Sequence, residues 1–503
     1  MKFYLVALGT FLLISSCRSS GNLHAITDAV KDDGEIEIVF VQANDVYEIA
    51  PLADGSGGLS KVAALKKSEV SANPNTFLVM AGDFLSPSVY NTLQYDGKRI
   101  RGQQMIDVMN TAGFDLAVFG NHEFDVTENE LQERINESSF QWISSNVFHQ
   151  LKDSVIPFVK YRNGVTARLP DQEIITVKDK DGTTARIGII GITITTNNSA
   201  YVHYRDPLES AKKVYESIKD SCDAVIALTH QTIREDIKLA GQLPGLALIL
   251  GGHEHDMRFN KTGNVYITKS HANARSAYVV KLHINTRTHV VSVVPELKEL
   301  DKNAATDSAT NVAVKKWMDI ADRNYSATGF DPQRIIIAAG DSLEGREAQV
   351  RKGTTNFTEL IVKAMAGACP AADIVIMNAG SIRLDDVLDP PVSEYDILRS
   401  LPFGGSIRET EMKGALLKQI LEAGEKSRGG GAFLHYYPAC IVIDPARVYR
   451  VGLTDFLFSG GENNIRFLNK DNPGIVKVYD EVASPEDARS DIRLAIVRYL
   501  LKQ

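Results

Sequence analysis

The sequence predicts an α/β protein of two domains joined by a helix. The chain has 503 residues, which is more than one hydrophobic core usually organises. Through the first 300 residues, short apolar runs alternate with helix-like stretches, and each run ends in a cluster of Gly, Asp, Asn or His. A polar segment then separates these runs from a second set that begins near IIIAAGDS. We therefore expect domains over residues 36–300 and 336–503, with a linker helix over 301–335.

Composition limits the class of partner. Hydrophobic residues make up 44% of the chain, as in a globular protein, and the formal net charge is −8. A chain with this charge has no overall basic surface for the backbone of a nucleic-acid polymer, so such a polymer is not an expected partner. The negative net charge is compatible with a small phosphorylated ligand that is held by metal ions.

The N-terminal residues have the pattern of a secretory signal. The stretch MKFYLVALGTFLLISSC combines one Lys, an apolar run too short to span a bilayer and two small residues before Cys17. LISSC resembles a bacterial lipobox, in which the chain is cut before a Cys that is then lipidated. We expect residues 1–17 to be a lipoprotein signal that includes the lipidated Cys17, and 18–35 to be a polar tether. The protein would then be anchored by lipid in a bacterial cell envelope, on its periplasmic or surface face; the alternative is an ordinary signal peptide with an incidental Cys.

Five apolar runs of the first domain end in side chains that can bind metals. The runs are EIEIVFVQAND, FLVMAGDFLS, DLAVFGNHEFD, AVIALTHQ and LALILGGHEHD. Loops that follow the strands of an open α/β sheet converge at one edge. The side chains brought there would be Asp45, Asp83, Asn121, His122, His230, His253 and His255. Carboxylate oxygens together with imidazole nitrogens suit Zn, Mn, Fe or Co, so the sequence predicts a metal site at this edge.

In this order, NDVYE, GDFLS, GNHEFD, LTH and GGHEHD resemble the motifs of the calcineurin-like metallophosphoesterases. More narrowly, the chain is similar to the 5′-nucleotidase family, which includes periplasmic UDP-sugar hydrolases and cell-surface ecto-nucleotidases. The resemblance runs from about residue 36 to near the end, and GNHE and GGHEH are its most specific parts. It implies a four-layer first domain, with two sheets sandwiched by helices, and a smaller α/β substrate-binding domain.

The resemblance also implies two divalent metal ions. One ion would be held by Asp83, Asn121, His230 and His253, and the other by Asp45, the shared Asp83 and His255. Such a pair of ions holds a phosphate and activates water for attack on phosphorus.

Two residues of GNHEFD are expected to take part in catalysis. His122 would stabilise the charged phosphoryl group or protonate the leaving oxygen. Asp125, three residues later, would accept from the ring and set its tautomer. The alternative for Asp125 is a loop carboxylate that caps a helix.

Tyr47 departs from the family pattern, which usually has His two residues after the first Asp. A phenol with a pKa of about 10 is a poor neutral ligand, so we expect Tyr47 to donate a hydrogen bond, with coordination as phenolate as the alternative. His255 stands where many nucleotidases carry another polar residue and would supply the missing nitrogen. The expected result is a shifted metal preference and a working site.

The second domain carries a candidate nucleotide pocket. DIVIMNAGSIR, LPFGG and DFLFSGGENN resemble the segments that line this pocket in the family. The resemblance makes Asn378 and Arg383 polar contacts of the substrate, Phe403 a stacking partner of the base, and Gly460 and Gly461 a tight turn.

One position of this pocket departs from the family pattern. Asn464 stands where a second stacking aromatic is usual, so nucleobase affinity is expected to be low. The candidates to replace that aromatic are Phe467, Phe433 and the pair Tyr436 and Tyr437, for which core packing is the alternative role.

These features together predict a metal-dependent phosphoric ester hydrolase. The expected reaction is cleavage of nucleoside 5′-monophosphates or related esters to nucleoside and phosphate. A UDP-sugar or 2′,3′-cyclic-nucleotide phosphodiesterase is the alternative within the enzyme class. A surface binding protein that has lost turnover is the alternative outside it, and the intact Asn121 and His122 favour the enzyme.

Overall fold

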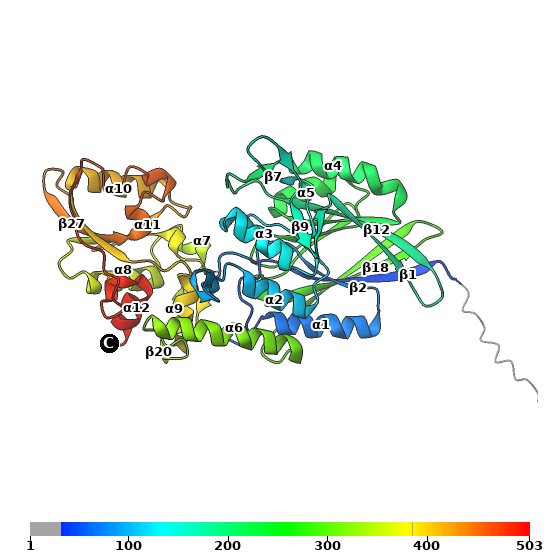
Figure 1. The fold of residues 1–503 in the computed structure, drawn as a ribbon, viewed down its shortest axis with the longest axis horizontal. Helices are drawn as coiled ribbons and strands as arrows, with labels where there is room; N and C mark the ends of the chain where they lie inside the picture. Colours follow the sequence, from blue (N-terminus) through cyan, green and yellow to red (C-terminus); the bar gives the residue numbers. More distant parts are fainter. Residues whose placement is uncertain (1–31, 385, 503) are drawn as a thin grey trace, which may run out of the picture.

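The computed structural model describes residues 32–384 and 386–502. The predicted signal peptide, Cys17 and all but the end of the predicted tether lie outside these residues. Figure 1 shows two bodies side by side, the N-terminal one on the right and the C-terminal one on the left. Among the described residues, none of the helices has the length and apolar character that crossing a membrane requires.

The first domain is built on two six-stranded sheets that pack face to face. The first sheet has the strand order β19-β18-β1-β2-β5-β6. Its strands are β1 (Glu35–Ala43), β2 (Thr76–Met80), β5 (Leu116–Val118), β6 (Gln141–Ile143), β18 (Ser276–Asn285) and β19 (Val290–Glu299). The second sheet has the order β11-β12-β14-β15-β17-β16. Its strands are β11 (Gln172–Lys178), β12 (Thr184–Thr193), β14 (Ala224–His230), β15 (Leu248–Gly252), β16 (Arg258–Thr262) and β17 (Val265–Lys269).

Helices cover the outer face of each sheet. The first sheet is covered by α1 (Leu59–Ala72), α2 (Gln103–Ala112), α3 (Glu128–Glu137) and α6 (Ser308–Ala327), and the second by α4 (Pro207–Ile218) and α5 (Ile233–Gln242). In β1, Ile38 and Phe40 face the core between the sheets, while Val39 and Val41 face the helices. A strand buried on both faces has a nearly continuous apolar sequence, which explains the run EIEIVFV. The predicted four-layer architecture is confirmed.

The second domain is a smaller α/β layer structure. Its five-stranded sheet has the order β26-β22-β27-β25-β28. The strands are β22 (Ile374–Asn378), β25 (Ile407–Lys413), β26 (Leu434–Tyr437), β27 (Val448–Thr454) and β28 (Ile475–Val478). Helices α8 (Asn356–Ala368) and α12 (Ile492–Leu500) pack on one face and α10 (Gly414–Lys426) on the other. The predicted α/β character of this domain is confirmed.

Short elements complete the described chain. The short helices are α7 (Glu347–Val350), α9 (Glu394–Ser400) and α11 (Asp455–Phe458). The short strands are β3 (Gln94–Tyr95), β4 (Lys98–Arg99), β7 (Val147–Gln150), β8 (Val155–Ile156), β9 (Val159–Arg162), β10 (Val165–Arg168), β13 (Val202–Tyr204), β20 (Ile335–Ile337), β21 (Leu343–Glu344), β23 (Val387–Leu388) and β24 (Val392–Ser393).

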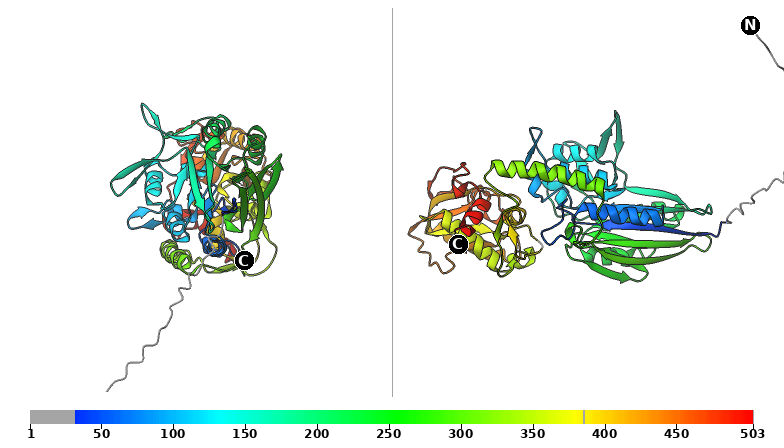
Figure 2. Two further views of the ribbon diagram at one scale, coloured as in Figure 1. Left: turned by 90° about the vertical axis from the view of Figure 1, so that its right-hand side faces the viewer. Right: turned by 90° about the horizontal axis from the view of Figure 1, so that it is seen from below.

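Helix α6 lies within the predicted linker, and its apolar side is part of the first domain. The side chain of Asp307 caps its first turn by accepting from the Thr310 amide at 2.9 Å. Trp317 and Tyr325 are buried in the same core as the outer face of the first sheet, and Leu398 of α9 reaches that core from the second domain. Figure 2 shows α6 running along the first domain toward the second. The two domains therefore meet through buried apolar side chains as well as through the chain itself.

Candidate metal centre and substrate cleft

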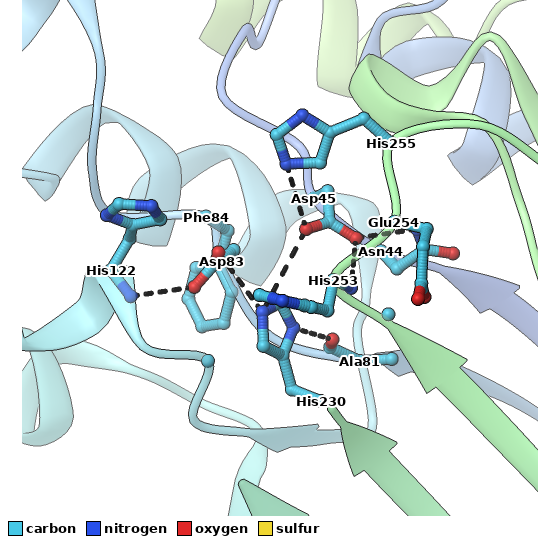
Figure 3. Close-up of polar contacts among 12 residues, drawn as sticks. Asn44, Asp45, Ala81, Asp83, Phe84, His122, His230, His253, Glu254 and His255 are labelled. Atoms are coloured by element: carbon cyan, nitrogen blue, oxygen red, sulfur yellow. Dashed lines mark hydrogen bonds and ion pairs between the residues drawn. The ribbon is translucent and has the colours of Figure 1, made fainter. Parts of the chain in front are cut away.

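The carboxyl ends of five strands meet at one point of the first domain. Strands β1, β2 and β5 of the first sheet are parallel to each other, as are β14 and β15 of the second, so within each sheet their carboxyl ends lie at one edge. Figure 3 shows the result: Asp45, Asp83, His230 and His253 converge, and His122 and His255 flank them on either side. The structure thus brings these six residues, which were predicted from the strand ends, into one site.

The centre of this site fits a metal ion. One ligand atom each from Asp45, Asp83 and His230 lie within 4.8 Å of one another. His230 Nε2 lies 3.1 Å from Asp83 Oδ2. Asp45 Oδ1, Asn121 Oδ1 and His230 Nε2 are buried and make no hydrogen bond among the described residues. Buried polar atoms normally have partners, so the atoms of Asp45 and His230 indicate a ligand at the site that these two residues form with Asp83.

The remaining predicted ligands lie beside this centre. Burial, reinforced by the nearby His230, lowers the pKa of His253 to about 4, which keeps its ring neutral and able to coordinate. His255 Nε2 lies 3.5 Å from Asp45 Oδ1. The Tyr47 hydroxyl donates to Asp83 Oδ2 at 3.3 Å and lies 3.0 Å from His255 Nε2. Tyr47 therefore contacts both a carboxylate and an imidazole of the site.

His122 forms a dyad with Asp125 at the edge of the centre. Its Nδ1 lies 2.7 Å from Asp125 Oδ2, and its backbone amide donates to Asp83 Oδ1 at 2.8 Å. Asn197 Nδ2 in turn donates to Asp125 Oδ1 at 3.0 Å. Burial lowers the pKa of His122, but the negative charges of Asp83 and Asp125 outweigh it and raise that pKa above its usual value. The ring is thus oriented by Asp125 and readily protonated.

Three of the site residues leave their strands with a left-handed backbone. Asp45 has φ 53°, Asp83 φ 56° and His253 φ 85°. Positive φ is unfavourable for residues with a Cβ atom, and such conformations concentrate at functional sites. Backbone amides of these turns make hydrogen bonds that stabilise the conformation. The Asp45 amide donates to Gly82 O at 3.0 Å, and the His253 amide donates to Asp45 Oδ2 at 2.9 Å.

Sequence reasoning missed two supporting residues of this site. The buried carboxylate of Glu123, within GNHEFD, accepts from the backbone amides of Asp83, Phe84, Leu85 and Gly120 at 2.5–3.0 Å. At Gly120, an added Cβ would lie 2.0 Å from Asp83 Oδ1. Both residues could be seen in the sequence, as the Gly and the Glu on either side of His122. The role of Glu123 as an acceptor could not, because it depends on contacts with the backbone that follows β2.

A cleft of about 780 Å³ connects the centre to the second domain. The first domain lines it with His122, His253 and His255, and the second with Arg351 and Arg383 among others. Cationic side chains of the second domain thus face candidate metal ligands of the first.

Of the residues predicted to bind substrate, Arg383 is the one that lines this cleft. Its guanidinium carbon lies 5.7 Å from the ring centre of Phe403, which is 50% exposed, and its Nη1 lies 3.4 Å from Glu347 Oε1. Asn378 is buried and donates to Glu462 Oε2 at 3.2 Å. Asn378 and the turn at Gly460 and Gly461 are not among the residues lining the cleft.

Asn464 faces the interior of its own domain. Its amide donates to Ala423 O at 3.0 Å and to Ser427 Oγ. Phe433 is buried, and Tyr436 and Phe467 pack against the core beside α10. Tyr437 is 39% exposed on the edge strand β26. Core packing therefore accounts for three of the four aromatic residues proposed to replace the missing stacking partner.

Known proteins share both halves of this architecture. Residues 38–257 match the family of calcineurin-like phosphoesterases, and residues 336–448 match the 5′-nucleotidase C-terminal domain. The two matches fall in the two predicted domains. UshA of Escherichia coli is 23% identical over 500 residues, covering 84% of this chain and 86% of that protein. The trifunctional nucleotide phosphoesterase YfkN of Bacillus subtilis is 25% identical over 440 residues, covering 80% of this chain, which spans 28% of that longer protein.

A solved structure has the same fold. The 5′-nucleotidase precursor of Thermus thermophilus superposes with a TM-score of 0.68 at 21% identity, covering 93% of this chain and 96% of that one. Relatives of these kinds indicate a phosphoric ester hydrolase, as predicted from the sequence.

Proposed function

We propose that this protein is an envelope-anchored hydrolase with two metal ions that cleaves nucleoside 5′-monophosphates or related phosphate esters to nucleoside and phosphate. The observation that carries the proposal is the position of the cleft. On one side stand the converging Asp and His side chains of the first domain, and on the other stands Arg383 of the second. A substrate in the cleft would offer its phosphate to the first set and its leaving group to the second domain.

The residues proposed to hold the ions are those predicted from the sequence: Asp83, Asn121, His230 and His253 for one, and Asp45, Asp83 and His255 for the other. The buried atoms Asp45 Oδ1, Asn121 Oδ1 and His230 Nε2 make no hydrogen bond among the described residues, which supports this assignment. When bound, a pair of divalent ions clamps a phosphate and lowers the pKa of the attacking water.

The protein's own groups then act on the phosphoryl oxygens and the leaving group. His122, oriented by Asp125, would donate from its second ring nitrogen to a phosphoryl oxygen or to the leaving oxygen. Its raised pKa supports this role, because the protonated ring is the form that donates.

The second domain would hold the part of the substrate that leaves. The forked guanidinium of Arg383 can pair with anionic or hydroxyl oxygens, and the exposed ring of Phe403 offers a face for the base. With Asn464 turned inward, stacking from one side only is expected.

Anchoring to the envelope is proposed from LISSC and Cys17, which lie outside the described residues. Replacement of Cys17 by Ser should leave the precursor uncleaved or release the protein from the membrane fraction. Wild-type protein in the soluble fraction would contradict lipidation.

A direct assay tests the reaction. AMP, UDP-glucose and 2′,3′-cyclic AMP would be compared after removal of metal by chelation and again after addition of Mn²⁺. We expect metal-dependent release of phosphate from AMP at a higher kcat/KM than for the two diesters. Preference for a diester would favour the phosphodiesterase alternative, and no turnover of any substrate with two bound ions would favour a binding protein.

A further inference from the structure

A fully buried lysine lies behind the candidate metal centre. Lys269 is the last residue of β17, and its side chain is 0% exposed. Its ammonium lies 2.5 Å from Gln231 O, 2.8 Å from Gly252 O and 2.5 Å from Glu254 Oε2. It also lies 2.8 Å from Asp236 Oδ2. One cation therefore joins two backbone carbonyls and two carboxylates.

These contacts fall on the chain neighbours of the predicted ligands. Gln231 directly follows His230, Gly252 directly precedes His253, and Glu254 separates His253 from His255. The carbonyls of Gln231 and Gly252 belong to the ends of two adjacent strands, β14 and β15. Charge-assisted hydrogen bonds from a single ammonium fix both ends relative to each other.

Both carboxylates that meet Lys269 also accept hydrogen bonds from other groups, as a buried charged cluster requires. Asp236 Oδ1 accepts from Thr229 Oγ1 at 2.8 Å and from Gln231 Nε2 at 3.0 Å. Glu254 Oε1 accepts from the Ile233 amide at 2.6 Å, at the start of α5. Burial alone would lower the pKa of Lys269, but Asp236 and Glu254 raise it above its usual value, so the side chain stays charged.

The strand beside Lys269 is shaped to admit it. At Gly251, an added Cβ would lie 2.8 Å from Lys269 Cε and 3.0 Å from Asp236 Oδ2. A side chain at position 251 would thus displace the lysine from its carbonyl partners.

We propose that Lys269 is a positioning residue of the metal centre. Its ammonium holds the ends of β14 and β15 in register, so that His230 and His253 present their ring nitrogens to the same ion. The inference rests on the proposed function, because it takes these two histidines to be metal ligands. Removing an outer partner of this kind typically weakens metal binding about 10–100-fold.

The first test is Lys269→Met in the full-length protein. The dissociation constant for Mn²⁺ would be measured by chelator competition on metal-free protein, together with far-UV circular dichroism and the urea midpoint. We expect folded protein that binds Mn²⁺ about 10–100-fold more weakly than wild type. The matched control is Lys61→Met. Lys61 is another buried lysine, and its ammonium donates to the carbonyl of Gly55, so Mn²⁺ affinity should be unchanged in that variant.

A second variant separates positioning from general stability. Lys269→Met leaves the buried carboxylate of Asp236 without its cation, which is strongly destabilising. Adding Asp236→Asn removes that charge while the side chain keeps an acceptor for Thr229. We expect the double variant to recover most of the urea midpoint and to keep the weakened Mn²⁺ affinity. If the single variant does not fold, Mn²⁺ affinity can still be measured on the double variant.

Two results would overturn the inference. Affinity within about threefold of wild type in either folded variant would show that the strand ends do not need Lys269. Recovery of Mn²⁺ affinity together with stability in the double variant would assign Lys269 a merely structural role. A wild-type protein that bound no Mn²⁺ or Zn²⁺ would overturn the proposed function as well, whereas an unchanged variant beside a metal-binding wild type would overturn only the inference.

Discussion

The hydroxyl of Tyr47 stands between a carboxylate and an imidazole. It donates to Asp83 Oδ2 and lies within hydrogen-bond distance of His255 Nε2. The rings of Tyr47 and His255 also meet edge to face, with centroids 5.5 Å apart. The predicted role as hydrogen-bond donor and the phenolate alternative give different metal contents in variants of Tyr47.

Two substitutions at this position distinguish these roles. Tyr47→Phe should keep two metal ions per chain and lose activity, because the donor is removed without removing a ligand. Tyr47→His should bind the ion beside Asp45 more tightly, since imidazole coordinates at neutral pH without losing a proton. Elemental analysis of the three proteins gives the stoichiometry. One ion in the Phe variant and two in wild type would mean that Tyr47 is a ligand.

The contacts of His122 indicate a role other than metal ligand. Because its Nδ1 is engaged by Asp125 and its amide by Asp83, His122→Ala should retain both ions and lower kcat by about 10²–10⁴. Metal content and steady-state rates on AMP measure the two effects. Asp125→Asn, which keeps a polar partner without its charge, should give a smaller loss. Loss of an ion from His122→Ala would make His122 a ligand.

Among the elements of the fold, the short 3₁₀ turn His122–Asp125 joins two strand ends. It does so through Glu123, whose carboxylate gathers the amides that follow β2 and the amide of Gly120 after β5. The same turn therefore presents His122 to the cleft and fixes the loop that carries Asp83.

Glu123→Gln tests this coupling with almost no change in size. One carboxylate oxygen is replaced by the amide NH2 group of Gln, which cannot accept from the backbone N–H donors around it. At least one buried donor therefore loses its acceptor. We expect the free energy of unfolding to fall by about 2–4 kcal/mol in urea denaturation. Glu133→Gln on α3 is the control, since its side chain is 45% exposed, and a shift below about 0.5 kcal/mol is expected there. Equal stability of both variants would remove Glu123 from this structural role.

In the whole molecule, the second domain touches the loop that carries Asp45. The hydroxyl of Tyr395, on α9, donates to Glu48 Oε2 at 2.6 Å, and Arg275 of the first domain lies 3.6 Å from Asp386 of the second. Substrate specificity is therefore expected to depend on a surface that approaches the metal centre from a separate domain.

Phe403→Ala measures that dependence. An exposed ring that stacks on a base should matter for AMP and not for p-nitrophenyl phosphate, which has no base. Stacking of about 1–3 kcal/mol corresponds to a loss of roughly 5- to 150-fold in kcat/KM for AMP. Tyr161→Ala, at another exposed aromatic residue, is the control. Equal losses on both substrates would place Phe403 outside the base-binding surface.

The burial of Glu48 at the contact between the domains predicts a dependence of stability on pH. Burial raises the pKa of Glu48 to about 7, against an ordinary value of 4.5. The folded protein thus holds a proton that the unfolded chain releases between these values, so stability falls as pH rises from 4.5 to about 7. The change is at most about 3 kcal/mol for the metal-free protein. The slope of the urea midpoint across this range should become less steep in Glu48→Gln, while buried Glu123, whose pKa is also raised to about 7, keeps its own share. An identical slope in that variant would assign the dependence to other groups.

Local patterns of the chain were sufficient for the fold class and for the group of candidate ligands. An apolar run such as EIEIVFV, with a polar cluster directly after it, can be recognised from a few neighbouring residues. Parallel strands end at a common edge of their sheet, which brings together Asp45 and Asp83 after β1 and β2. His230 ends β14 of the second sheet, and it joins them because the two sheets pack face to face. The departures at Tyr47 and Asn464 could likewise be read from single positions, although the inward turn of Asn464 could not.

The contacts that hold the site together depended on the tertiary structure. Glu48 and Tyr395 are 347 positions apart, and Glu123 reaches amides 38 to 40 positions away. The apolar residues of α6 have the same helical pattern whether they line a linker or a core, so only packing assigned Trp317 to the first domain. Lys269 gave no signal in the sequence, because a lysine at the end of a strand is ordinarily solvated. It acquires its partners only when β14, β15 and β17 lie side by side and exclude water around its ammonium.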